Sequence, residues 1–530
     1  MRVLGWPLAL AAFLLAGCGS LPKRPVETVS TPIPAAEATA LGRSMAPALA
    51  AHPRLSGVYA LKNGSDAFVA RMALAATAER TLDVQYYIWE RDDAGKLLAN
   101  QLLQAADRGV HVRLLLDDIG ANPSDTHLLG LDSHTNIEVR LFNPVANRTF
   151  RRLSSIFDFG RVQRRMHNKS FTVDGQVTII GGRNIGDEYF GFGSDVEFAD
   201  LDVMAIGPVV RATARAFDLY WRSEASVPIK SLDAQATTTK KEVAEQRTTL
   251  VAESERLHNS AYLQAERDSV IVKGLRQANL PWFWGEARLV YDLPAKVTRE
   301  SEDPSEDLMA QLRPIIEGTQ HEMLIVSAYF VPGKAGVAFF RALRKRGVRV
   351  VIITNSLAAT DVTAVHAGYR RYRKALLQAG VELYEFKPTA SVKELSNKRK
   401  GSASRGGGSG SGSSRASLHA KTFVFDGQKI FVGSLNLDPR SVALNTEIGA
   451  VFDIPELARS AQSEIVGNNL QNCYRLELAP RSNANTRCSH VVWVEEENGK
   501  VTAYSREPGA SVGRRLLVAL VSLLPIESQL

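Results

Sequence analysis

Apolar residues follow two different periods along the chain, and these periods alternate. Residues 66–80 and 96–108 carry apolar side chains every three to four positions, as amphipathic helices do. Residues 81–89 and 110–116 are short apolar runs typical of buried strands. Strands that alternate with helices in this way favour βα units around a mostly parallel sheet. We therefore expect an α/β fold.

The same pattern returns in the second half of the chain. The run at residues 321–332 matches the strand at 81–89, and Arg346-Gly347-Val348 matches Arg108-Gly109-Val110 at an offset of 238 positions. A chain of 530 residues is long enough for two domains. We predict two pseudo-symmetric βα domains whose sheets pack against each other at a shared cleft.

Changes in composition set the expected segment boundaries. They are a leader at 1–17, a tether at 18–54, a first domain at 55–225, a helical connector at 226–285, a second domain at 286–487 and a C-terminal hairpin and helix at 488–530. The apolar helix near the C-terminus is too short to span a bilayer. We expect it to dock on the core, with shallow insertion into a membrane face as the alternative.

Two copies of one polar pattern stand out from the apolar background. Residues 166–184 read MHNKSFTVDGQVTIIGGRN, and residues 417–436 read SLHAKTFVFDGQKIFVGSLN. Histidine, lysine, aspartate and asparagine recur at the same intervals, 252 positions apart: His167, Lys169, Asp174 and Asn184, then His419, Lys421, Asp426 and Asn436. The rise from 238 to 252 places an insertion in the second half.

Each copy is predicted to be a β-hairpin with an Asp-Gly turn. A histidine and a lysine two residues apart then project from one face of the strand. Asp174 and Asp426 lie in the turns, roughly 23 Å along the strand from their histidines, which is too far for proton exchange. We assign both aspartates a structural role and expect the small residues after each return strand to bring Asn184 and Asn436 back towards the histidine.

Two histidines, two lysines and two asparagines are what phosphodiester chemistry requires. Cationic and amide donors hold the non-bridging oxygens, while a nucleophile and an acid stand on opposite sides of phosphorus. The pattern HxKxxxxD followed by G[GS]xN, present twice, resembles the phospholipase D superfamily. That resemblance implies an α/β fold of two phospholipase D-like βα sandwich domains sharing one active-site cleft. It implies a phosphohistidine on His167 with His419 as acid and then base, and no metal or cofactor.

A catalytic histidine also needs a carboxylate on its second ring nitrogen. In the second half Glu447 matches the acid that the superfamily places downstream of the motif. In the first half Asp202 is the better match, and Asp195 and Asp200 are competitors.

The strand DVQYYIW, the two motifs and an Asn-Ser loop before residues 363–377 together resemble bacterial cardiolipin synthases, especially those of the C type. The resemblance implies phosphatidyl transfer between phospholipids, with phosphatidylglycerol or phosphatidylethanolamine as donor. The departures are Gly182, where serine is usual, and a basic, Gly/Ser-rich stretch at 392–416 that reads as a flexible flap or a tolerated insertion. The alternatives are a phospholipase D hydrolase, a periplasmic nuclease and a non-enzymatic envelope protein.

The N-terminus predicts an anchored envelope protein. A basic start, an apolar run and Leu15-Ala16-Gly17-Cys18 resemble a bacterial lipoprotein signal, with a plain secretory signal as the alternative. Lipidation of Cys18 would place the protein on the periplasmic side of a membrane, the outer one in a Gram-negative cell. In that oxidising compartment Cys473 and Cys488 are expected to form a disulfide.

The charge of the chain agrees with a membrane partner. A net charge of +8 and a pI near 9.3 favour anionic partners, either phospholipid headgroups or nucleic acid. The expected lipid anchor favours the membrane, so no nucleic acid partner is predicted. Arginines at 151, 152, 161, 164 and 165 are interleaved with phenylalanines and read equally as a headgroup-attracting mouth or as a solvated basic loop.

Overall fold

The computed structural model describes residues 38–148, 151, 158–192, 196–232, 239–257, 269–298, 304–388, 415–480, 489–497, 499–524 and 527–529. The predicted leader, Cys18, most of the Gly/Ser-rich stretch, Asp195 and Cys488 lie outside these ranges. What the sequence predicts for those positions, including the disulfide, stays a prediction.

The first half is a mixed sheet with a parallel centre. β2 (Thr81–Tyr86), β3 (His111–Asp117) and β4 (Ile137–Phe142) run parallel, as their helix-separated apolar runs predict. The remaining strands pair antiparallel and complete the order β9-β4-β3-β2-β5-β6-β8-β1. They are β1 (Ser56–Leu61), β5 (Ser170–Val173), β6 (Val177–Gly181), β8 (Asp202–Ile206) and β9 (Ser226–Pro228).

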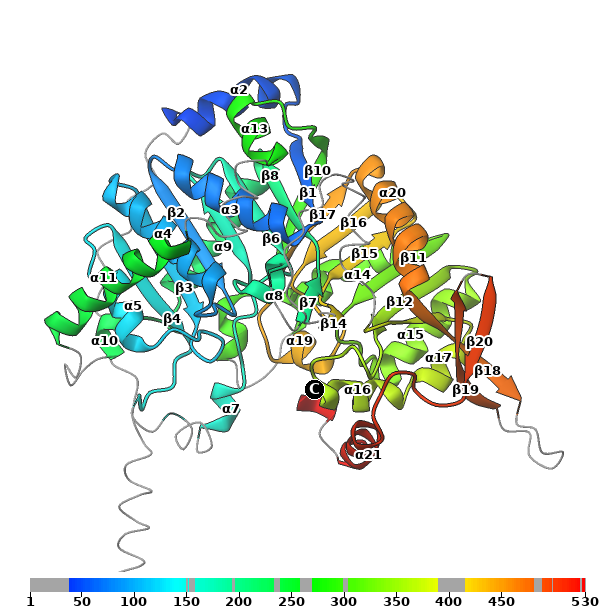
Figure 1. Cartoon of the computed structure of the whole chain (residues 1–530). Helices are drawn as coiled ribbons and strands as arrows, with labels where there is room; N and C mark the ends of the chain where they lie inside the picture. The colour runs from blue at the N-terminus through cyan, green and yellow to red at the C-terminus, as the bar shows by residue number, and fades with distance from the viewer. Residues whose placement is uncertain are drawn as a thin grey trace, which may run out of the picture.

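Helices cover both faces of this sheet (Figure 1). On one face α3 (Gly64–Thr77), α4 (Asp93–Asp107) and α5 (Asp125–Asp132) bury their apolar sides in one core cluster with β2 and β3. On the other face α9 (Pro208–Arg222) fills the space towards the second half. The predicted helices and strands therefore exist, with ends shifted by a few residues.

The second half repeats this plan. Its parallel strands are β11 (Glu322–Ser327), β12 (Arg349–Asn355) and β13 (Glu382–Phe386), and its antiparallel strands are β15 (Lys421–Phe425), β16 (Lys429–Gly433), β17 (Ile448–Asp453) and β10 (Phe283–Tyr291). Its helices are α14 (Leu308–Gly318), α15 (Gly333–Lys345), α16 (Thr363–Arg370), α17 (Arg373–Gln378), α19 (Pro439–Ala443) and α20 (Pro455–Glu464). The predicted α/β fold of two pseudo-symmetric halves is confirmed.

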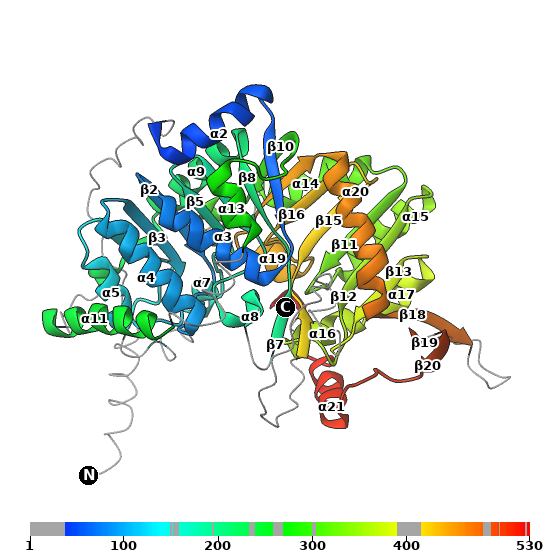
Figure 2. The same cartoon turned by 45° about the horizontal axis from the view of Figure 1, so that its top comes forward.

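The halves are joined along their sheets and across them. β1 pairs antiparallel with β10, which makes one continuous 18-stranded sheet (Figure 2). β7 (Val196–Ala199) of the first half pairs in parallel with β14 (Arg415–Leu418) of the second, and Met166 bridges to Thr446. An apolar core with residues from both halves lies between them. Backbone pairing and a shared apolar core therefore hold the two halves together.

Helices and strands also form in the segments expected to be a tether, a connector and a C-terminal hairpin with its helix. Residues 40–51, expected in the tether, form α2 (Ala40–Ala51), because Leu41 and Met45 recur on one face and are buried. The expected connector packs on the first half through α11 (Lys240–Arg256) and α13 (Val270–Gln277), and Figure 2 shows α11 lying along α4 and α5.

The C-terminal hairpin is likewise not a separate unit. β18 (Cys473–Pro480), β19 (Ser489–Glu497) and β20 (Lys500–Tyr504) extend the second sheet beyond β13, and α21 (Val512–Val521) follows them. Within the ranges given above, no helix has the length and apolar character needed to cross a bilayer.

Candidate active site between the two halves

Each motif histidine stands at the point where its strand meets the opposite half. The Met166–Thr446 bridge places His167 directly beside Glu447, and the His167 amide donates to the Thr446 carbonyl at 2.8 Å. The β7–β14 pair ends with Leu418 opposite Ala199, and the His419 amide donates to the Ala199 carbonyl at 2.8 Å. The pairing across the interface thus builds the site.

The first pair is His167 with Glu447. The imidazole Nδ1 lies 2.8 and 3.1 Å from the two carboxylate oxygens of Glu447. The Ser434 hydroxyl donates to the same carboxylate, and the Asp292 carboxylate accepts the Glu447 amide at 2.8 Å. Tyr87 packs edge-on against the imidazole, with ring centroids 5.0 Å apart. The ring is therefore fixed through Nδ1, which leaves Nε2 for chemistry.

The second pair is His419 with Asp200. Nδ1 of His419 lies 2.6 Å from Oδ2 of Asp200. Tyr189 and Phe198 pack on the imidazole, each with its ring centroid 5.1 Å from that of His419. Both histidines therefore take their carboxylate from the opposite half of the chain.

The prediction that Asp202 orients the first-half histidine is wrong. The Asp202 carboxylate is fully buried and accepts a hydrogen bond from Arg71 at 2.8 Å and another from the Arg183 amide at 3.1 Å. It neutralises a buried guanidinium within its own half. The histidine partner is the competitor Asp200, and its histidine is His419 rather than His167.

Strand register shows why Asp200 is the counterpart of Glu447. Gly433 pairs with Gly449 in the second half, and its repeat Gly181 pairs with Asp202 in the first, so Gly449 and Asp202 are equivalent positions. Glu447 and Asp200 each lie two residues before them. A sequence signal for this existed. Pro208 and Pro455 both begin the helix after the strand, and their offset of 247 positions maps Glu447 onto Asp200.

The different length of the two acids, Glu447 and Asp200, also explains why residue 182 is glycine. It is the repeat of Ser434, which donates to the longer carboxylate of Glu447. A Cβ on Gly182 would lie 2.3 Å from Oδ1 of Asp200. The aspartate side chain therefore requires glycine at this position, as the glutamate accommodates serine in the other half.

Lys169 and Lys421 are buried beside the histidines. Lys169 donates to the His167 carbonyl at 2.7 Å, and Lys421 donates to the His419 carbonyl and lies 3.0 Å from its Nδ1. Burial lowers the pKa of both ammonium groups, that of Lys169 well below its ordinary value. The charge of Lys421 lowers the pKa of Lys169 further, and both lysines lower the pKa of the two histidines. Such a pair of poorly solvated cations is suited to bind a phosphodiester.

Asn184 and Asn436 are buried just after the return strand of each hairpin and bind the chain that follows the first parallel strand of their half. The Asn184 carbonyl accepts the Ile88 amide at 3.1 Å, and the Asn436 carbonyl accepts the Tyr329 amide at 3.4 Å. Ile88 and Tyr329 each lie two residues beyond the first parallel strand of their half. The amide group of Asn184 also donates to the Tyr189 hydroxyl at 3.0 Å.

Asp174 and Asp426 lie at the far end of the hairpins and hold the start of a strand. Both have positive φ, 51° and 53°, in the turn. The Asp174 carboxylate accepts the amides of residues 79, 80 and 81, and the Asp426 carboxylate accepts those of residues 320, 321 and 322. These contacts are those of a structural residue.

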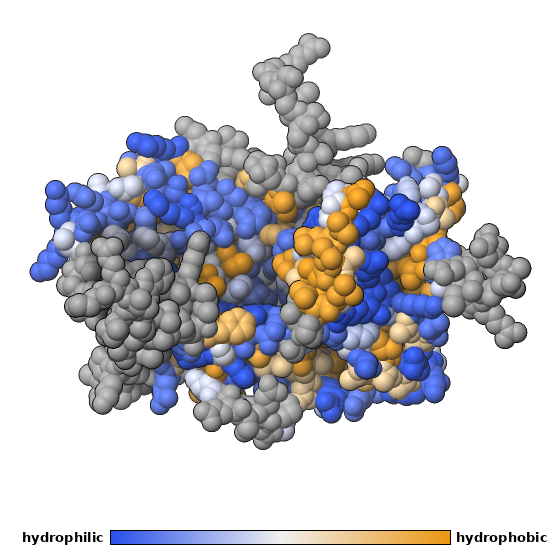
Figure 3. All heavy atoms as spheres, turned by 90° about the horizontal axis from the view of Figure 1, so that it is seen from below, coloured by the Kyte–Doolittle hydropathy of each residue, from blue (hydrophilic) through white to orange (hydrophobic). Residues whose placement is uncertain are grey.

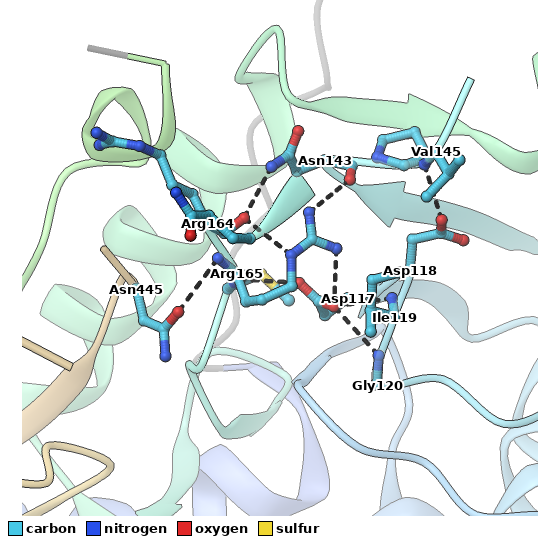
Figure 4. Close-up of polar contacts among 12 residues, drawn as sticks. Asp117, Asp118, Ile119, Gly120, Asn143, Val145, Arg164, Arg165 and Asn445 are labelled. Atoms are coloured by element: carbon cyan, nitrogen blue, oxygen red, sulfur yellow. Dashed lines mark hydrogen bonds and ion pairs between the residues drawn. The ribbon is translucent and has the colours of Figure 1, made fainter. Parts of the chain in front are cut away.

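The backbone before each histidine is held by a polar side chain that the sequence analysis did not single out. The Asp117 carboxylate, at the end of β3, accepts the Met166 amide at 2.9 Å and pairs with the buried Arg165 at 3.2 Å (Figure 4). Asn355, at the end of β12, accepts the Leu418 amide at 2.9 Å and donates to the Leu418 carbonyl at 2.8 Å. Asp117 and Asn355 are 238 positions apart, which is the offset of the strands that carry them.

The arginine-rich stretch before the first motif has a structural role at several positions. Figure 4 shows Arg165 turned inward, where it donates to the Asn143 carbonyl at 2.7 Å, and its amide contacts Asn445 of the second half at 3.3 Å. Arg164 donates to the Lys296 carbonyl at 2.9 Å. Both arginines hold the chain before His167 in place; Arg165 is buried, whereas Arg164 is partly exposed.

The two His-carboxylate pairs differ in their electrostatics. Burial, with the lysines nearby, lowers the pKa of His167 well below 6.5, and burial raises the pKa of Glu447 to about 8. Burial and Lys421 lower the pKa of His419 to about 4. Burial acts to raise the pKa of Asp200, but the hydrogen bond and charge of His419 outweigh it and bring the value to about 2. Asp200 is therefore the more firmly ionised acid.

Two further features border the site. A mainly apolar cavity of about 290 Å³ lies in the interface behind Asp200, between β8 and β15 and beside α20. In the part of the chain that the structure describes, no three His, Cys, Asp or Glu side chains are grouped so that they could hold a metal ion.

The fold and the site define a class: a two-domain α/β protein with one His-Lys-Asn site assembled from both halves, of the phospholipase D type. The family model described as "Cardiolipin synthase, PLD-like domain" matches residues 72–203 and 312–467. This chain belongs to that family.

The relatives agree with this assignment. Cardiolipin synthase C of Escherichia coli is 44% identical over 493 residues, which cover 92% of this chain and 99% of that protein. Cardiolipin synthase B of Escherichia coli is 24% identical over 79% of this chain and 82% of its own length. The solved phosphatidylserine synthase of Haemophilus influenzae shares the fold with a TM-score of 0.52 at 15% identity, covering 81% of this chain and 91% of that one.

Proposed function

We propose that this protein is a phosphatidyltransferase that makes cardiolipin from phospholipids through a phosphohistidine intermediate, without a metal. The observation that carries the proposal is the pair of buried imidazoles, each held at Nδ1 by a carboxylate from the other half and flanked by a buried lysine. We propose that the two Nε2 atoms, which these contacts leave unused, act on opposite sides of one phosphorus.

In the first step His167 acts as the nucleophile. Its Nε2 attacks phosphorus of the donor lipid, the bond from phosphorus to the headgroup oxygen breaks, and the His419 imidazolium gives its proton to the leaving alkoxide. The leaving alcohol is glycerol from phosphatidylglycerol or ethanolamine from phosphatidylethanolamine. Lys169 and Lys421 hold the non-bridging oxygens, whose charge grows in the transition state.

In the second step the neutral His419 acts as a base. It takes the proton of a glycerol hydroxyl on the acceptor phosphatidylglycerol, the resulting oxygen attacks phosphorus, and the bond to His167 breaks. Cardiolipin leaves, and His419 is again protonated while His167 is again neutral. Atoms and charge balance over the two steps.

Electrostatics support this division of roles. A nucleophilic imidazole must be neutral, and the pKa of His167 is held well below its ordinary value by burial. Burial and Lys421 bring the pKa of His419 to about 4 in the free protein, and the Asp200 carboxylate acts against this lowering. We propose that the negative charge of a bound phosphodiester adds to that of Asp200 and raises the pKa of His419 far enough for it to act as the acid. His167 is therefore assigned as nucleophile and His419 as acid and base.

The test is incubation of the detergent-solubilised protein with labelled phosphatidylglycerol, with and without phosphatidylethanolamine and a chelator, followed by lipid separation. Cardiolipin is expected from the wild type with the chelator present, at less than about a thousandth of that rate from His167→Ala or His419→Ala. Cardiolipin formation by either variant at a rate near that of the wild type would contradict the mechanism. Phosphatidic acid as the main product would favour the hydrolase, in which water resolves the phosphohistidine.

We also propose that Cys18 is lipidated and holds the protein on the periplasmic side of the cell envelope. The support is the Leu15-Ala16-Gly17-Cys18 signal. Metabolic labelling with a fatty acid should mark the wild type and not Cys18→Ser. Unlabelled wild type of the size expected after cleavage would show a plain secretory signal instead.

A further inference from the structure

The C-terminal helix α21 exposes most of its apolar side chains. Val518 is buried, whereas Leu516 and Leu520 are 61% and 56% exposed, and Leu523, two residues beyond the end of the helix, is 80% exposed. From below, these leucines and their neighbours form the raised apolar patch over α21 in Figure 3. An apolar surface gathered on one helix is what interaction surfaces present, unlike scattered single residues.

The patch is mounted rigidly on the second half. Arg514 of α21 donates to the Ala358 carbonyl at 3.2 Å and to that of Thr360. Ahead of the helix, Glu507 is buried and pairs with Arg373 of α17 at 2.8 Å. The leucines are therefore held outward by polar bonds to the core and do not belong to a frayed end.

The helix lies at the end of the sheet where the site is. The loop that Arg514 holds follows β12 directly, and Asn355 at the end of β12 fixes the residue before His419. Asp361 of that loop also accepts from the Tyr329 hydroxyl at 2.6 Å, and the Tyr329 amide donates to Asn436. Only short chains of contacts separate α21 from the catalytic residues.

Other exposed apolar side chains occur on the same end of the molecule. Ile119 and Val362 follow β3 and β12, and Phe159 on α7 (Phe159–Val162) and Val442 on α19 flank the strands that carry His167 and Glu447. Figure 1 places α7, α16, α19 and α21 together at the lower side. Arg370 and Arg371 at the end of α16 are partly exposed, and their guanidinium groups pair with Glu507 at 4.0 Å and with Glu527 at 3.1 Å.

We propose that α21 and these neighbours form the surface by which the protein docks on the bilayer that holds its substrate. The leucines of α21 enter the acyl region, and the surrounding arginines lie among anionic phosphate groups. This proposal rests on the proposed function, because the catalytic end needs to face a membrane only if the substrate is a lipid in that membrane. A protein anchored only at its N-terminus would not fix that orientation.

Docking is tested first without turnover. Full-length Leu520→Trp is mixed with phosphatidylglycerol vesicles whose acyl chains are brominated, and Val270→Trp is the matched control. Val270 is 63% exposed on α13, at the opposite end of the molecule in Figure 1. We expect added quenching, relative to the wild-type tryptophans, at position 520 and not at 270. Equal quenching at both positions, or none at 520, would overturn the proposal.

Activity supplies the second arm. The triple variant Leu516→Glu, Leu520→Glu, Leu523→Glu should lose about tenfold on vesicles and keep near wild-type turnover in mixed micelles, whereas Val270→Glu should match the wild type in both. Equal loss in both media, or a wild-type dimer that the triple variant abolishes, would overturn docking. If the wild type turned over no phospholipid, the proposed function would fail while the quenching arm still decided docking.

Discussion

At the scale of single residues, the site is decided by two acids that are two positions apart. Asp200 and Asp202 are both buried, but one faces a histidine of the other half and the other faces an arginine of its own. Asparagine at either position would preserve size and remove charge. The two variants should therefore fail in different ways.

Asp200→Asn is expected to lower kcat by about 10²–10⁴-fold, because the amide does not stabilise the imidazolium. Loss of the negative charge lowers the pKa of His419 further, so the limb of the kcat/KM profile that requires protonated His419 moves to lower pH. Asp202→Asn removes one partner of a buried ion pair, which costs about 3–5 kcal/mol of unfolding free energy, with kcat of the folded fraction nearly kept. Pre-steady-state turnover and thermal unfolding, measured on both variants, separate these results; an unchanged profile in Asp200→Asn would contradict the pairing.

Gly182→Ser tests whether the halves are interchangeable at the acid. The serine would copy Ser434 in the second half, but its Cβ meets the Asp200 carboxylate at 2.3 Å. We expect the carboxylate to be displaced from His419 and kcat to fall at least about tenfold, with the fold intact. Ser434→Gly is the matched control, because it removes one hydrogen bond to Glu447 and introduces no clash. Wild-type kcat in Gly182→Ser would show that Asp200 has room to move.

At the scale of secondary-structure elements, each histidine depends on a strand in the parallel centre of its sheet. Asp117 and Asn355 end equivalent strands and bind the residue before His167 and His419. They touch the backbone of the motif and not the reacting atoms, so they are positioning residues. A displacement of about 1 Å at the histidine is costly for the reaction.

The two braces should respond differently to conservative replacement. Asn355 both accepts and donates, so Asn355→Asp loses the bond to the Leu418 carbonyl. Asp117 accepts the Met166 amide and pairs with the buried Arg165, so Asp117→Asn keeps one acceptor but leaves a buried guanidinium without its charge partner. We expect kcat to fall about tenfold in both variants with KM little changed, and the free energy of unfolding to fall by about 3–5 kcal/mol in Asp117→Asn alone. Wild-type kcat in Asn355→Asp, or a change confined to KM, would contradict a positioning role for Asn355.

The hairpins and their six polar residues could be predicted from sequence because an exact repeat of spacing is a strong signal. Asp117 was missed, and Asn355 was noted only as part of the Asn-Ser loop, because each is one polar residue at the end of an apolar run. Only the offset of 238 between them marks the two as a pair. Asp202 was preferred to Asp200 because the second half has five fewer positions between motif and acid than the first half. The offset falls from 252 at the motifs to 247 at Pro208 and Pro455. Each histidine binds a carboxylate of the other half, and this is a tertiary contact that residue spacing within one half cannot predict.

At the scale of the whole molecule, the chain behaves as one catalytic unit made of two incomplete halves. Neither half supplies the carboxylate that binds its own motif histidine. The strand pairs β1–β10 and β7–β14 and the Met166–Thr446 bridge join the halves. The interface also buries a shared apolar core. The site is therefore complete within one chain and absent from either half alone.

This arrangement predicts how inactive variants combine. A mixture of His167→Ala and His419→Ala proteins should remain inactive, because restoring a site would require a first half of one chain to pair with a second half of another, breaking the continuous sheet. The measurement is cardiolipin formation after co-incubation of the two proteins, and after their co-expression from two genes, with the wild type at equal concentration as the reference. Recovery of turnover only after co-expression would show that halves exchange between chains during folding, while recovery on simple mixing would show an open interface that this pairing of strands forbids.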